Sequence, residues 1–365
     1  MKFRRQNGFT LMELLMSVFL LGILSVALSP TFRTFMTAND LAYRNQQAAI
    51  NQEIANSIMG YANLAVVPAG TTPAPCNSSA NKVFYAVYNA TLCGATAALQ
   101  PYLIQQGVPM NSVNTDNTAN QNVRVYQRLS GISQTAYLFY QAGPVVYLNY
   151  DYGVVYLTNC GQNQPCNQTT ASATAPPSSQ PVLTTETLAV VGSPRLTTAN
   201  QATWTPGTRD VGAAYVSTLP LQMQMLQNTS SQLDRLRTSF TNYFTQMQAA
   251  NPLATTNFYP APTNVARWIT PGSPATNQGC REGWYALDDP TIDILWQVGL
   301  GAATNVNYGR TAWGGSIGYC RDYDPEGLST YNAPPHFAAL RINNALSYGM
   351  AGDTATFSNN AVISF

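Results

Sequence analysis

The segment "RRQNGFTLMELLMSVFLLGILSVALSP", residues 4–30, contains an apolar run from Phe9 to Ser29 behind a short basic head. As an α-helix this run would rise about 31 Å, which is enough to cross the hydrocarbon core of a bilayer. One residue does not fit a plain membrane anchor, because Glu13 lies inside the run. A carboxylate at bilayer depth costs about 2.5–3.5 kcal/mol on insertion scales, so a charge kept there predicts a function and a partner.

The composition is that of a folded, weakly charged chain. Of its 365 residues 9% are charged and 11% are aromatic, and 17 basic and 16 acidic residues leave a formal net charge of +1. With this aromatic content and long Val/Tyr runs, we expect the chain to fold rather than stay disordered. The small net charge argues against nucleic acid as a partner, because it gives no long-range field that would attract phosphates.

Two simple interpretations of the N-terminus are a secretory signal peptide and a plain anchor, but neither explains Glu13. The residues together resemble the class III signal of type IV prepilins, which type IV pilins share with the pseudopilins of type II secretion. The resemblance covers roughly residues 1–55 and makes residues 1–8 a leader peptide. Gly8 would then precede the cut made by prepilin peptidase, and Phe9 would become the N-methylated first residue. Glu13 falls fifth in the mature chain, as the family expects.

The resemblance implies an assembly role for Phe9, Glu13, Gly22 and Pro30. In the family, the freed amine of Phe9 is thought to pair with Glu13 of a neighbouring subunit, which recovers much of the cost of two unpaired charges in lipid. Gly22 and Pro30 lie where many pilins have helix-weakening residues. Glycine costs a helix about 1 kcal/mol and proline lacks the N–H for an i−4 hydrogen bond. We expect the helix to stretch or melt between them when the subunit leaves the membrane.

The sequence predicts an α+β fold, in which a long N-terminal transmembrane and amphipathic helix packs on an antiparallel β-meander of pilin-like type. The helix is expected over residues 9–62, with 9–29 in the membrane. Its exported part has one apolar face, which we expect to pack on the sheet. The residues of this face are Tyr43, Ile50, Ile54, Ile58 and Tyr61.

The β head is expected over residues 63–166, where Val/Tyr-rich runs indicate strands. The last three runs lie between Ala136 and Leu157, and the segments 142–144 and 151–153 are interpreted as the turns that separate them. A Thr/Ser/Pro-rich linker follows over 167–182, with a composition typical of O-glycosylated segments.

An additional C-terminal module is expected over residues 183–365. It is predicted to be loop-rich, with one amphipathic helix from Met225 to Gln248 that packs on a sheet. The apolar residues that recur at helical spacing are Leu226, Leu233, Leu236, Phe240, Phe244 and Met247.

The cysteines favour disulfides over a metal site. They are Cys76, Cys93, Cys160, Cys166, Cys280 and Cys320. None forms a C-x-x-C pair and the chain has one histidine, so no zinc site is predicted. An even count in an exported chain favours three disulfides in an oxidising compartment. Sequential pairing (Cys76–Cys93, Cys160–Cys166, Cys280–Cys320) is our hypothesis, and it is one of fifteen possible connectivities.

Two motifs in the last third of the chain were considered as chemical sites. Residues 314–318, "GGSIG", match the nucleophile elbow around Ser316, with Asp322 or Asp324 and then His336 following in hydrolase order. The surrounding sequence is glycine-rich and predicts neither the strand before nor the helix after that an elbow needs, so we expect no catalytic residue and no enzyme. Asp322, Asp324 and Glu326 supply alternating oxygen ligands that suit calcium, the alternative being a solvated turn. No other cofactor is expected.

These observations predict a structural subunit that acts by assembly. The precursor is expected to cross the inner membrane once with its N-terminus in the cytoplasm, and the cleaved chain to enter an extracellular pilus. Its partners would be prepilin peptidase and other pilin subunits. The chain length and the added module favour a minor or tip-located subunit with an adhesive or priming role, with a surface or glycan ligand. A major pilin and a type II secretion pseudopilin are the alternatives, and a membrane-tethered hydrolase is a distant one.

Overall fold

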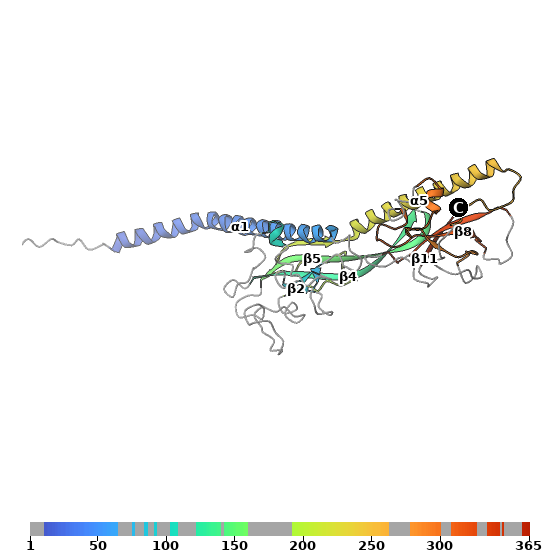
Figure 1. Ribbon diagram of the computed structural model, residues 1–365. Coiled ribbons are helices and arrows are strands. Elements are labelled where there is room, and N and C mark those ends of the chain that lie inside the picture. Colours follow the sequence, from blue (N-terminus) through green and yellow to red (C-terminus); the bar gives the residue numbers. More distant parts are fainter. Residues whose placement is uncertain are drawn as a thin grey trace, which may run out of the picture.

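The computed structural model describes residues 11–64, 75–76, 84–86, 91–92, 103–108, 122–139, 142–159, 192–262, 278–300, 308–326, 334–343, 345–346 and 360–365. Figure 1 shows a long helix, α1, whose second half lies beside a sheet, and a C-terminal region that continues beyond the end of this helix. The architecture is α+β, with a long apolar N-terminal helix and antiparallel sheets, as the sequence predicted.

Helix α1 spans Leu11–Leu64 without a break, so that it would be about 81 Å long. Gly22 and Pro30 both lie inside this helix. Pro30 has no N–H to donate to the residue four positions earlier, but the helix is not interrupted there. In its second half Ile54 and Ile58 are fully buried against the sheet and Ile50 is partly buried, which confirms the predicted packing face at these positions.

The central feature of the sheet is one long hairpin of β4 (Asn122–Phe139) and β5 (Ala142–Asn159). The expected three-strand meander in this region is wrong, because residues 151–153 lie inside β5 and are not a turn. Tyr152 and Gly153 pair with β4 on one side and with β6 on the other. Glycine is needed here because the ring of Tyr126 packs directly on the backbone: a Cβ atom at Gly153 would lie 2.6 Å from Cε2 of Tyr126.

Short strands extend this hairpin into a sheet of order β10-β5-β4-β2, to which β6 adds by pairing with β5. These strands are β2 (Phe84–Ala86), β6 (Asp210–Ser217) and β10 (Ala345–Leu346). Strands β1 (Pro75–Cys76) and β3 (Thr91–Leu92) form a separate antiparallel pair. Helix α1 packs mainly on β6 and β5, and the residues between them form the first core.

Residues 192–217 pack as part of this head, although the sequence analysis placed them in the C-terminal module. Strand β6 pairs with β5, and Trp204 from the preceding turns is buried against Tyr156. The turns are held by Asp210, whose carboxylate accepts hydrogen bonds from Ser193 Oγ (2.6 Å) and from the N–H of Gly207 (2.7 Å). The linker expected over 167–182 lies outside the described residues.

The C-terminal region is built on helix α5 (Leu219–Ala250), which begins directly after β6 with proline in its first turn. Its predicted apolar face is confirmed, since Leu226, Leu233, Leu236 and Phe240 are buried in a second core. Met247 is 37% exposed and lies beyond that core. The helix is longer at its N-terminal end than the predicted 225–248, because it continues the chain straight out of β6.

A four-stranded antiparallel sheet packs against α5; the sequence analysis expected α5 to pack on a sheet but did not identify these strands. Its order is β11-β9-β8-β7. The strands are β7 (Tyr285–Ala286), β8 (Gly318–Tyr323), β9 (Phe337–Asn343) and β11 (Asn360–Ser364), and a single helical turn, α6 (Ile294–Gln297), lies between β7 and β8 in the sequence.

A buried polar cluster joins the two cores where β6 passes into α5. Arg128 Nη2 lies 2.7 Å from Asp151 Oδ2, and the side chains of both residues are 9% exposed. The backbone of Asp151 is also tied to Thr218, whose N–H donates to the Asp151 carbonyl (3.0 Å) and whose Oγ1 accepts from the Asp151 N–H (2.8 Å). A buried ion pair offsets its desolvation cost only when its geometry is good, so Arg128 and Asp151 are held in place. Because Thr218 precedes α5 and is bonded to Asp151, the cluster fixes the start of α5 relative to the hairpin.

Candidate assembly site on the N-terminal helix

The first part of α1, residues 11–46, is here called the stem, and it is exposed at every position whose side chain the structure describes. Met12 is 80% exposed and Phe19 69%. By length and composition alone, the helix that contains the stem could cross a membrane. Soluble monomers rarely leave so large a continuous apolar surface in water, so the stem must be covered by lipid or by protein.

The second half of α1 is docked on the head by close backbone contact. Gly212 of β6 has a φ of +62°, and a Cβ atom there would lie 2.6 Å from Cα of Ala48. No side chain larger than hydrogen fits between this strand and the helix. The stem therefore projects from a point where helix and sheet touch directly.

Polar side chains in the same contact form what we call the clasp: Gln47 and Asn51 of α1 with Arg124 of β4. Asn51 Nδ2 donates to the backbone carbonyls of Val211 (3.1 Å) and Gly212. Arg124 donates to Asn51 Oδ1 and, from Nη2, to Gln47 Oε1 at 2.8 Å. Arg124 and Asn51 are fully buried, so these hydrogen bonds replace water that the groups would otherwise need.

Burial also changes the electrostatics of the clasp. Desolvation of the guanidinium lowers the pKa of Arg124 to about 10, with a smaller opposing effect from Tyr43. The residue still carries its charge at neutral pH, because that pKa is well above 7. The clasp thus holds a buried cation directly behind the helix that carries the stem.

The residues expected to control processing and pairing are only partly described. Gly8 and Phe9 lie outside the described residues, and Glu13 is helical in its backbone while its side chain lies outside the described set. Gly22 lies in the exposed stem with no atom within 4 Å of a Cβ at that position. Pro30 is also exposed, and its carbonyl accepts a hydrogen bond from Thr34 Oγ1 at 2.9 Å.

The comparison with protein families identifies the N-terminus. Residues 3–29 match the prokaryotic N-terminal methylation motif. This match supports a type IV pilin-like protein. The motif supports a type IV pilin or pseudopilin subunit of a secreted filament, and it implies processing by prepilin peptidase and assembly with other pilin subunits. A membrane-anchored precursor fits both the motif and the apolar stem. No curated protein and no solved structure matches the pilin-like chain.

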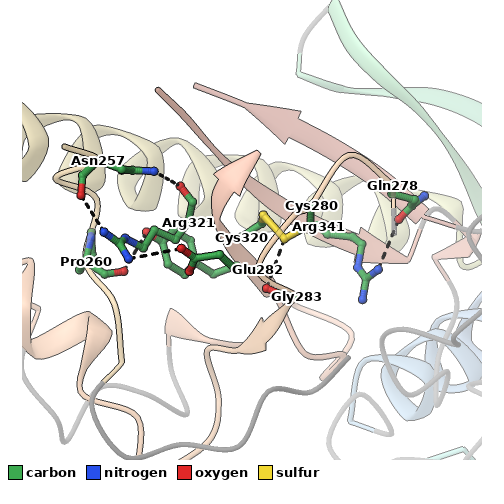
Figure 2. Close-up of a disulfide and its surroundings, with 10 residues drawn as sticks. Asn257, Pro260, Gln278, Cys280, Glu282, Gly283, Cys320, Arg321 and Arg341 are labelled. Atoms are coloured by element: carbon green, nitrogen blue, oxygen red, sulfur yellow. Dashed lines mark hydrogen bonds and ion pairs between the residues drawn. A yellow bond between two sulfur atoms is a disulfide. The ribbon is translucent and has the colours of Figure 1, made fainter. Parts of the chain in front are cut away.

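One of the three expected disulfides lies within the described residues. Cys280 and Cys320 are bonded, which confirms that pair. Cys93, Cys160 and Cys166 lie outside the described residues, and so does the side chain of Cys76. Figure 2 shows the bond with Arg321 on one side and the buried Arg341 on the other.

The arginines on either side of this bond order the C-terminal sheet. Arg321 donates from Nη2 to the carbonyl of Asn257 (2.7 Å) and from Nε to that of Tyr259 (2.8 Å). Arg341, which is 1% exposed, lies 4.4 Å from the ring centre of Trp284 in a cation–π contact. These contacts hold the sheet together.

The two sequence motifs considered as chemical sites do not come together in the described residues. Ser316 is followed by strand β8 rather than a helix, and His336 Nε2 lies 2.9 Å from the carbonyl of Thr255. Asp324 is buried, with Arg281 Nη2 3.3 Å from its Oδ2. Among the described residues no three His, Cys, Asp or Glu side chains are grouped as metal ligands would be, so Asp322, Asp324 and Glu326 do not converge.

Sequence reasoning missed the clasp. It assigned no role to Gln47, Asn51 or Arg124. A signal was present: Asn51 precedes Ile54 by three residues and Ile58 by seven, so it lies within the buried apolar face. Its partner could not be found in this way, because Arg124 comes from a strand 73 residues away in sequence.

Proposed function

We propose that this pilin-like chain is a minor, tip-located subunit of a type IV filament, which polymerises through its stem and acts by assembly rather than catalysis. Its C-terminal region would have an adhesive role or prime assembly. The observation that supports this proposal is the position of that region. Figure 1 shows α5 and the β8 sheet continuing beyond the C-terminal end of α1, away from the stem.

The in-line position matters because stems that pack side by side place successive heads above one another. A large region in line with the stem would then occupy the space of the heads that follow, unless the subunit stands at the end of the filament. A repeated major pilin would have to carry this region outside the shaft. A secretion pseudopilin would form a short filament with no need to display it.

The experiment is to locate the C-terminal region on purified filaments. The turn after α5 offers an insertion point, because Leu253 is 96% exposed. An epitope tag inserted after Leu253 should label filament ends in electron micrographs, and mass spectrometry should find a trace of chain that begins at N-methyl-Phe9. Labelling along the whole shaft would show a major pilin, and secretion loss without filaments on deletion would show a pseudopilin.

Glu13→Ala tests whether the stem drives assembly. The variant should accumulate in the membrane at wild-type level but enter filaments poorly, because the neighbour's N-terminal amine would lack its counter-ion. Asp234→Asn removes an exposed carboxylate from α5, away from the stem, and separates this effect from a general loss of negative charge. Normal incorporation of Glu13→Ala would contradict the pairing of Glu13 with Phe9.

A further inference from the structure

Strand β4 has an open edge over residues 132–139, the part of the hairpin nearest its turn. Strand β2 pairs with the same side of β4, but only over residues 125–127. An irregularity in the pairing between Leu129 and Ile132 separates that part from the rest of the strand. Over residues 132–139, β4 pairs with β5 on one side, and no described strand pairs with the other side. The backbone N–H and C=O groups that point outward there can therefore pair with a further strand.

The open edge lacks the features that usually keep an edge strand from pairing with another chain. Natural edge strands are very short, or carry lysine, proline or inward-pointing charges. The sequence of the open edge, ISQTAYLF, contains no charged residue and no proline. Ser133, Gln134 and Thr135 are exposed, and Tyr137 is 53% exposed. A long, uncharged and uncovered edge of this kind is a surface for β-strand addition.

The order of side chains along the open edge makes it complementary to itself. When two copies of a strand pair antiparallel about a twofold axis perpendicular to the sheet, one residue lies opposite its own copy. With Thr135 on the axis, Ser133 lies opposite Tyr137 on one face of the sheet. On the other face the apolar Ile132 lies opposite Leu138. Threonine pairs and apolar pairs of this kind stabilise neighbouring strands.

The two neighbouring registers fit less well. With Gln134 on the axis, only residues 132–136 would pair before the irregularity at Leu129 and Ile132 is reached. With Ala136 on the axis, Leu138 would lie opposite Gln134, so that an amide faces an apolar side chain. The axis at Thr135 pairs the longest stretch, residues 132–138, without such a mismatch.

The rest of the molecule leaves the open edge accessible. Strand β10 pairs with the other side of β5, and β9 leads directly into β10, so the C-terminal sheet is attached on the side away from the open edge. Leu138 packs in the core that α5 covers. Gln134 is on the same face of β4 as Leu138 but is exposed, so α5 does not extend over the open edge.

We propose that the open edge binds the open edge of a second copy, antiparallel and with Thr135 on the twofold axis. The sheet then continues from one copy into the other, and the contact is isologous and closes as a dimer. An extended segment of an unrelated protein would also satisfy the backbone groups of the open edge. The self-complementary order of its side chains favours a second copy.

This pairing has a consequence for where the two copies come from. In Figure 1 the β4–β5 hairpin runs in the same direction as α1. Because the pairing reverses the direction of the strand, the stems of the two copies point in opposite directions. Subunits of one filament share one stem direction, so the contact joins two filaments. This role rests on the proposed tip location, and it makes the adhesive partner the tip of another filament.

Cysteine cross-linking of full-length chains in detergent tests the register. Thr135→Cys should form a disulfide-linked dimer on a non-reducing gel, because the two Cα atoms would be about 4.5–5.5 Å apart. Ser133→Cys and Tyr137→Cys should each remain monomeric, since each residue would be about 13 Å from its own copy. A mixture of these two variants should cross-link. Thr241→Cys, exposed on α5, controls for random collision and should remain monomeric.

Charges on the axis test the contact without a covalent bond. Thr135→Lys and Thr135→Glu each place two like charges opposite each other, so sedimentation equilibrium should give a dimer dissociation constant at least ten-fold above that of the wild type. An equimolar mixture of the two variants should form a mixed dimer with a dissociation constant within three-fold of the wild type. Variants that had merely misfolded would not recover in this way.

The contact would be overturned by a wild-type chain that stays monomeric, by dimers that Thr135→Lys leaves unchanged, or by cross-linking of Ser133→Cys alone. Loss of the tip location is a separate outcome. Cross-linking at Thr135 together with an epitope tag that labels the whole shaft would overturn the tip location and keep the contact. Labelled filament ends without cross-linking at Thr135 would overturn the contact alone.

Discussion

Gly212→Ala tests the contact that sets the direction of the stem. The added methyl group would lie 2.6 Å from Cα of Ala48 and 2.7 Å from its backbone nitrogen, so helix and strand must move apart. Overpacking of this kind costs about 1–3 kcal/mol, and the left-handed backbone at φ +62° costs an alanine about 1–2 kcal/mol more. We therefore expect the free energy of unfolding to fall by about 2–5 kcal/mol.

The matched control is Gly192→Ala, in the same head. Gly192 also has a positive φ, +76°, but no atom lies within 4 Å of a Cβ at that position. It should lose only the backbone part, about 1–2 kcal/mol. Urea unfolding of the full-length chain in detergent, followed by tryptophan fluorescence, measures both, since Trp204 is buried in the head core. Equal losses for the two variants would mean that α1 does not touch β6 as described, and the direction of the stem would have to be revised.

Three further predictions concern the disulfide, the tyrosines and processing. Replacing Cys280 and Cys320 together by serine should cost about 4 kcal/mol in the same urea assay, because the bond closes a loop of 40 residues; a loss below about 1 kcal/mol would argue that the bond does not form. Burial raises the pKa of Tyr259 to about 12 and that of Tyr319 well above its ordinary value of 10, so the folded chain keeps protons that the unfolded chain loses. The contribution of these tyrosines to the free energy of unfolding is complete below pH 10 and is lost as the pH rises toward 12. Tyr259→Phe should make this decrease in stability with pH less steep. The lowered pKa of Arg124 has the opposite effect, because the unfolded chain then binds the additional proton. Gly8→Val should leave the leader attached, which intact-mass spectrometry of the membrane fraction would show; a mature chain beginning at Phe9 would assign the cut to another peptidase.

Much of the candidate site could be predicted from sequence because its signals are local. Length and hydropathy define the apolar run, and the cost of a carboxylate in lipid singles out Glu13 as a residue for which a partner is expected, without any knowledge of the fold. The same holds for the face of Ile50, Ile54 and Ile58 and for the apolar face of α5, which helical periodicity alone predicts.

The hairpin shows where local signals fail. Residues 151–153 have the composition of a turn, but Gly153 lies in mid-strand because the ring of Tyr126 needs the space. The strands of the four-stranded C-terminal sheet were missed for a related reason. The strands of this sheet are short, and each is held by partners distant in the chain: β8 pairs with β9, and the Cys280–Cys320 bond joins β8 to the segment before β7.

The amino-acid sequence by itself determined that this chain has a membrane-length stem, a class III signal, and a helix with one face for a sheet, since each depends on neighbours a few residues apart. Only the tertiary structure decided that Arg124 closes the clasp with Asn51 and that the C-terminal region continues in line beyond α1. These features depend on which distant segments meet. A buried charge or a glycine contact acquires its role only when the partner, dozens of residues away, is in place.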